Sequence, residues 1–144
     1  MPGLLADVNV QGHLPYLVRL IKELELLELL TEIGITFDTF PDYGLGRHIR
    51  DRELWLYCQA NQLVLFTENR NHEDEDSLDA TIQDSWREGH LPVLTLANKG
   101  KFERSASYAT RVANDVANLL FSTLYENVRN QPRIFVPLPR LANP

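Results

Sequence analysis

The chain has 144 residues, a length that fits one domain with a substantial core, since 44% of its residues are hydrophobic. Its 20 Asp and Glu residues outnumber its 14 Lys and Arg residues, and the formal net charge is −6. This balance argues against strong nucleic-acid binding, which clustered cations drive. A local strip of basic residues is still compatible with this acidic net charge.

The sequence gives few indications of compartment, and those it gives agree with each other. The single cysteine, Cys58, cannot form an internal disulfide and favours a reducing compartment. The leucine-rich segment 14–30 is interrupted by charged residues, so no apolar run is long enough for a signal peptide or a membrane span. We therefore expect a cytoplasmic protein without a membrane partner.

The first half of the chain alternates apolar runs with amphipathic segments. We predict strands at Leu4–Val8, Ile35–Phe40 and Leu63–Phe66, a long helix from about His13 to Glu32, and a helix that ends near Ala60. A β-α-β-α-β order is typical of a parallel sheet with right-handed crossovers. The first and third of these strands should therefore be parallel neighbours.

The second half continues the alternation. We predict a helix capped by Asp76 or Ser77, a strand Leu91–Leu96, a turn Asn98–Gly100, a helix from Ser105 to about Val128, and a strand Arg133–Val136. The chain is thus expected to be an α/β protein with four or five parallel strands. Residues 1–136 form the predicted domain, and residues 137–144 an extended tail.

Acidic side chains follow the ends of the predicted strands. Asp7 lies near the end of the first strand, Glu68 and Asn69 end the third, and Asp51 and Glu53 open the intervening helix. Because these ends meet at one edge of a parallel sheet, we expect a ligand site there. Carboxylate oxygens suit Mg²⁺ or Mn²⁺. Each acid also has a structural explanation, as a helix cap, a partner of the helix dipole or a loop contact.

Four arginines flank these acids: Arg47, Arg50, Arg52 and Arg70. Arginine can grip phosphate with two parallel hydrogen bonds, which predicts a nucleic-acid contact. The alternative is that these side chains neutralise neighbouring Asp and Glu residues.

Several short motifs, in order, resemble those of small bacterial PIN-like proteins, relatives of the VapC ribonuclease toxins. The segment Leu4–Val10 is similar to their L-x-D-E-N-x-P opening, and Val64–His72 is similar to V-L-V-T-N-D-R-D-F. The other matching segments are Gly34–Thr39, Tyr43–Gly46, Ile49–Trp55 and His90–Leu94. The resemblance covers about the first two thirds of the chain.

The resemblance implies a three-layer α/β/α fold with acids at the carboxyl ends of a parallel sheet. Active relatives hold Mg²⁺ or Mn²⁺ there and cleave RNA. By position, it implies catalytic roles for Asp7, Asp51 and Glu68, with Asn69 as a further metal ligand.

The chain departs from the family pattern at this site. Val8 stands where the motif has Glu, and Asn69 and Asn71 stand where it has Asp. Any metal site is therefore expected to be weak. Three functions stay open: a toxin-antitoxin type ribonuclease with a weakened acidic site, a catalytically inactive PIN-like binding or regulatory module, and a receiver-like phosphorylation module. The last lacks paired acids after the first strand.

The sequence also predicts partners. The helix ending near Glu32 carries more apolar residues than one core stripe needs, notably Leu26, Leu29 and Leu30. Exposed apolar patches often mark interfaces, so we expect a homodimer. RNA and a protein partner are further expectations.

Overall fold

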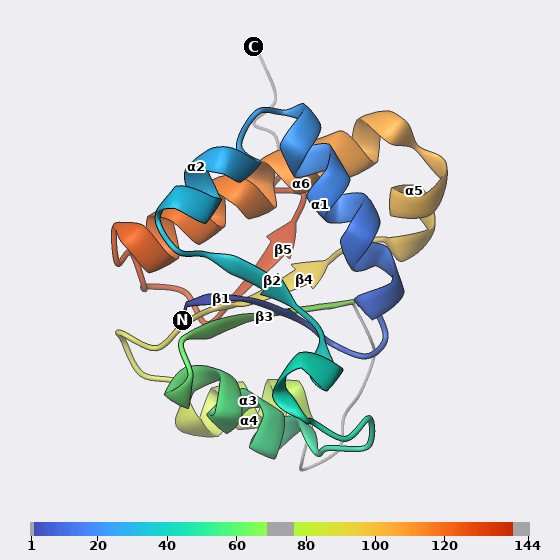
Figure 1. Ribbon diagram of the computed structural model, residues 1–144. Coiled ribbons are helices and arrows are strands. Elements are labelled where there is room, and N and C mark those ends of the chain that lie inside the picture. The colour runs from blue at the N-terminus through green and yellow to red at the C-terminus, as the bar shows by residue number, and fades with distance from the viewer. Residues whose placement is uncertain (1, 69–76, 140–144) are drawn as a thin grey trace.

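Figure 1 shows a computed structural model of the protein, which describes residues 2–68 and 77–139. Five parallel strands form one sheet in the order β2-β1-β3-β4-β5. Their bounds are β1 Gly3–Ala6, β2 Thr36–Asp38, β3 Leu63–Glu68, β4 Val93–Leu96 and β5 Arg133–Val136. The predicted parallel sheet, and the pairing of its first and third strands, are confirmed.

Helices cover both faces of the sheet and make the fold three-layered. Figure 1 shows α1, α2, α5 and α6 on one side and α3 and α4 on the other. The helices are α1 Leu14–Glu23, α2 Leu27–Glu32, α3 Asp51–Ala60, α4 Leu78–Ser85, α5 Lys99–Arg104 and α6 Ala106–Leu120. Short helical turns lie at η1 Gln11–His13, η2 Phe40–Tyr43 and η3 Phe121–Tyr125, the last with π-helical geometry. The three-layer α/β/α architecture is thereby confirmed.

The central strands divide the apolar side chains between two cores. Successive strand residues point to opposite faces, and β1 and β3 are buried on both. The core beneath α1 and α6 contains Leu4, Ala6, Val64 and Phe66, whereas the core beneath α3 and α4 contains Leu5, Leu63 and Leu65. The same alternation decides toward which layer each side chain points at the ends of the strands.

The sheet order creates a switch point at the carboxyl ends of β1 and β3. The chain leaves β1 for β2 on one side, while β3 pairs with β1 on the other side. In doubly wound sheets of this order, connections diverge at such a point and leave a crevice for ligands. Asp7 and the end of β3 therefore lie where this fold is expected to bind a ligand.

The prediction of one continuous helix from His13 to Glu32 is wrong. The helix ends at Glu23 and restarts at Leu27, with Glu25 in the left-handed region at φ 62°. The Leu26 N–H donates to the Ile21 carbonyl at 3.1 Å, which closes the end of α1. Leucines continue across the break because both helices pack on the same core, so their periodicity did not reveal it.

A second error lies between β4 and α6. The expected turn Asn98–Gly100 is instead the start of α5, whose first turn is capped by the Asn98 side chain accepting from the Lys101 N–H at 2.9 Å. The long C-terminal helix ends at Leu120, short of the predicted Val128, and passes into the η3 turn. Six-residue α5 carries one buried aromatic ring, a signal too short to show periodicity.

The predicted tail is described only through residue 139. Leu138 lies against α6, where its N–H donates to the Asp115 carboxylate at 2.7 Å and Arg111 donates to its carbonyl. The rest of the tail, residues 140–144, lies outside the described residues.

The apolar residues behind the predicted homodimer are partly internal. Leu30 is 1% exposed and belongs to the core, whereas Leu29 is 44% exposed. Further exposed apolar side chains lie at Tyr125, Val128 and Phe135. The homodimer remains a prediction. None of the helices in the described ranges is long and apolar enough to cross a membrane.

Candidate functional site

Asp7 is fixed at the switch point by the neighbouring strand. Its N–H donates to the Phe66 carbonyl at 2.8 Å, which extends the pairing of β1 with β3 by one residue. The Thr67 hydroxyl donates to the Asp7 carboxylate at 2.9 Å. Asp7 is only 4% exposed and Thr67 1%. A carboxylate so deeply buried requires polar partners, and the end of β3 supplies one.

Asp7 and Asp51 line one open cavity of about 260 Å³, beside Phe40 and Leu54. Arg47, His48 and Asn9 also line it, so carboxylate, cationic and amide groups meet in one space. Asp7 enters from the end of β1, whereas Asp51 enters from the first turn of α3. The sequence predicted these two acids at a common edge, and the fold brings them to the same cavity.

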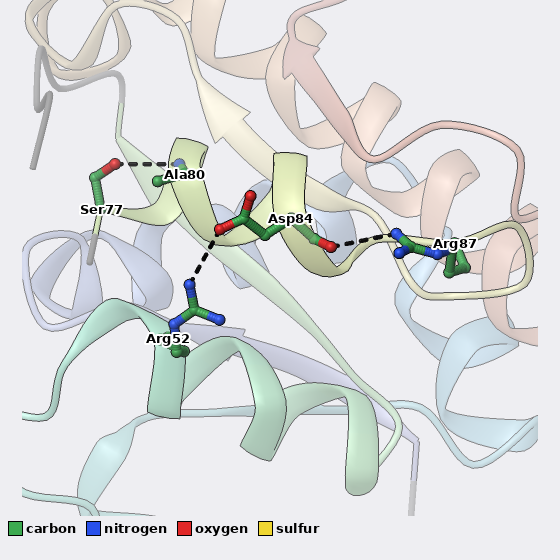
Figure 2. A network of polar contacts seen from close by, with 5 residues as sticks. All are labelled: Arg52, Ser77, Ala80, Asp84 and Arg87. Carbon is green, nitrogen blue, oxygen red and sulfur yellow. Dashed lines mark hydrogen bonds and ion pairs between the residues drawn. The ribbon is translucent and has the colours of Figure 1, made fainter. Parts of the chain in front are cut away.

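Asp51 has a structural role as well. Its carboxylate accepts a hydrogen bond at 3.1 Å from the Leu78 N–H, at the start of α4. The hydroxyl of Ser77 accepts from the Ala80 N–H, as Figure 2 shows, so α4 receives two caps. The alternative explanation of Asp51 from the sequence is a cap of its own helix. Instead, Arg50 occupies that cap position and Asp51 serves the next helix along the chain.

Glu68 points away from Asp7. It follows Thr67 directly on β3, and successive strand residues alternate between faces. Its carboxylate forms an ion pair with Lys99 of α5 at 3.1 Å, and its side chain is 19% exposed. Glu68 is thus engaged on the α5 side, while Thr67 contacts Asp7 on the α3 side.

The predicted phosphate-binding arginines separate into different environments. Arg47 lines the cavity beside Asp7. Arg52 turns toward α4 and pairs with Asp84 at 3.4 Å, and Figure 2 shows Asp84 between Arg52 and Arg87. The neutralising role is therefore observed for Arg52. Arg70 and the predicted metal ligand Asn69 lie outside the described residues.

Arg133 lies near the predicted acids, although no pattern in the sequence predicted it as a site residue. It starts β5, yet its guanidinium pairs with Asp79 of α4 in a small pocket also lined by Asp51, Thr67 and Glu68. A single arginine at the start of an edge strand has no motif around it. Only the sheet order could have placed it near the acids.

Cys58 lies behind the site in the α3 core and is 1% exposed. Burial, and to a smaller extent the negative charge of Asp7, raise the pKa of its thiol to about 12. A raised folded-state pKa gives stability that is complete below the unfolded-state pKa, near 9, and is lost as the pH rises toward 12.

We therefore expect Cys58→Ala to be less sensitive to alkali than the wild type. Between pH 8 and pH 10 the wild type should lose about 1 kcal/mol of its stability advantage over the variant, because one pKa unit corresponds to about 1.4 kcal/mol. Urea unfolding of both proteins under reducing conditions measures this difference. An advantage that stays constant across this pH range would contradict the buried thiol.

The expected acids Asp7, Asp51 and Glu68 all lie within the described residues. Across ranges 2–68 and 77–139, no three His, Cys, Asp or Glu side chains are grouped so as to hold a metal ion. No protein-family model, curated protein or solved structure matches the chain.

Proposed function

We propose that the protein is a PIN-like, divalent-metal-dependent ribonuclease with a weakened acidic site. The observation that carries the proposal is the buried Asp7 carboxylate, held by Thr67 at the β1/β3 switch point and lining a cavity with Asp51 and Arg47. The order of the PIN-like motifs along the sequence adds support.

The carboxylates that line the cavity are of the chemical type that binds Mg²⁺ or Mn²⁺, but they are few. Asp7 and Asp51 offer hard carboxylate oxygens, which these ions prefer. A bound ion would lower the pKa of a coordinated water and polarise a phosphoryl oxygen. With Glu68 committed to Lys99, we expect weak metal binding.

The residues of the chain have separable roles in this proposal. The Thr67 hydroxyl orients the Asp7 carboxylate by occupying one of its oxygens. Arg47 is the described arginine best placed to contact a phosphate, since it lines the same cavity. Its guanidinium would position the RNA backbone and partly offset the repulsion between phosphate and the two acids.

The proposal predicts that Asp7→Asn reduces Mn²⁺-dependent RNA cleavage by about 100-fold or more, because the variant removes charge from the ion site. Asn keeps an oxygen acceptor for the Thr67 hydroxyl, so the fold should survive. Thr67→Val, which removes only the orienting hydroxyl, should reduce cleavage about 10- to 100-fold. Cleavage of a fluorescent RNA at saturating Mn²⁺ measures both variants.

Arg87→Gln supplies a control, because Arg87 contacts the backbone carbonyls of Asp84 in α4 and of Trp86 just after it, and does not line the cavity. It should leave cleavage unchanged. Equal cleavage by the wild type and Asp7→Asn would refute the site assignment.

A second candidate function is a catalytically inactive PIN-like binding or regulatory module. The Lys99–Glu68 ion pair favours it, because that contact removes the acid that could compensate for Asn69. Absence of RNA cleavage together with absence of Mn²⁺ binding by calorimetry would select this alternative. In either case we propose a cytoplasmic protein that forms a homodimer, with RNA or a protein as its partner.

A further inference from the structure

A groove of about 760 Å³ lies at the corner between α1 and α2, on the helical layer opposite α3. Leu27 supplies apolar lining, and Lys22, Glu25, Glu28, Thr31 and Glu32 complete it. The groove thus combines apolar surface with three exposed carboxylates and one exposed lysine, and it is separate from the cavity beside Asp7.

Glu25 occupies a backbone position that does not favour glutamate. It follows α1 with φ 62°, in the left-handed region where glycine or asparagine costs least. The hydrogen bond from the Leu26 N–H to the Ile21 carbonyl fixes this conformation. The fold thus holds a carboxylate at the groove by means of a conformation in which Gly or Asn would be better tolerated.

The charges at the groove decide which occupant it fits. A second copy of this chain would bring three further carboxylates and a single lysine, Lys22, against the same set, so the groove faces excess like charge. A basic partner instead gains from each carboxylate, while an apolar side chain can cover Leu27. The described groove therefore disfavours self-association on this face.

We propose that the α1–α2 groove docks a segment of another protein that carries an apolar residue flanked by Lys or Arg. The apolar side chain would bury against Leu27, and its basic neighbours would pair with Glu28 and Glu32. Glu25 would contact the segment where it passes the end of α1. This docking is independent of any chemistry at Asp7.

The test uses the full chain and a fluorescein-labelled probe peptide that alternates Leu with Lys pairs. Fluorescence anisotropy in about 150 mM salt measures its affinity, a condition at which distant charges are screened. We expect Glu28→Gln/Glu32→Gln to weaken binding about fivefold, and Leu27→Ser to weaken it by a similar factor. A peptide with Gln in place of Lys should bind at least tenfold more weakly than the probe.

Glu25→Gly and Glu25→Asn separate binding from folding. Both residues tolerate the left-handed region, so the melting temperature should be unchanged or raised, while peptide binding falls about threefold. A variant that was merely misfolded would lose both. Equal binding by these variants and the wild type would count against a role for Glu25.

The matched control is Glu53→Gln/Glu88→Gln, which removes the same charge from exposed positions on α3 and after α4. It should change peptide affinity less than twofold. If this control lost as much peptide affinity as the groove variants, the binding would depend on overall negative charge rather than on the groove. That result would overturn the proposal. A groove variant that changed the molar mass in sedimentation would also overturn it, by assigning the groove to a second copy.

Discussion

Replacing Phe102 with Ala should destabilise the protein by about 4 kcal/mol, the largest effect we expect from a single truncation. The ring is fully buried in the core beneath α1 and α6. It meets Tyr16 edge-on with centroids 5.2 Å apart, and His13 lies 6.0 Å away. Deleting a buried phenyl ring costs about 3–5 kcal/mol, because the transfer energy is lost and a cavity remains.

The loss should extend beyond the cavity itself. Phe102 is the one buried residue of α5, so it anchors this short helix on the core. Lys99 belongs to the same helix and pairs with Glu68 at the end of β3. Loosening α5 should therefore weaken that ion pair as well. Chemical denaturation of the variant measures the total cost.

Phe135→Ala is the appropriate comparison, since it makes the same chemical change at a ring that is 43% exposed. We expect it to cost less than about 1 kcal/mol. Phe102→Leu, which refills most of the volume, should cost less than about 2 kcal/mol. If Phe102→Ala cost no more than Phe135→Ala, the burial of α5 described here would be wrong.

The buried strands were predictable because their signal is local. Leu63–Glu68 is a short apolar run that ends in polar residues, and the same pattern marks the first strand. The bounds of both strands were therefore predicted nearly correctly. Their parallel pairing was predicted from the helices between them in the sequence. The presence of acids at the carboxyl edge came from the same reasoning.

The partner of each acid could not be predicted from the sequence in the same way. Asp51 caps α4, and Glu68 pairs with Lys99 of α5, and both partners lie in segments far along the chain. No periodicity encodes such contacts. The break between α1 and α2 at Glu25 was not predicted for another reason. Glutamate is an uncommon residue in the left-handed conformation that ends α1.

The close approach of β1 and β2 at Gly3 also could not be predicted from the sequence. It leads to the second mutation for which we expect a large loss of stability. Gly3 pairs with Thr36 where β1 lies beside β2. A Cβ atom added to Gly3 would lie 2.6 Å from the Thr36 carbonyl oxygen and 2.5 Å from its hydroxyl oxygen. We expect Gly3→Ala to destabilise the protein by about 3 kcal/mol, the upper part of the range for overpacking.

Rotation of the Thr36 side chain cannot relieve this clash. The hydroxyl could turn away at the cost of its 2.7 Å hydrogen bond to Asp38, but the carbonyl oxygen belongs to the backbone of β2. Thr36→Ala should therefore rescue Gly3→Ala only in part. Gly12→Ala is the matched control, because a Cβ there meets nothing within 4 Å. That control should change stability by less than about 1 kcal/mol. Equal stability of the two alanine variants in urea unfolding would show that β1 and β2 are not packed this closely.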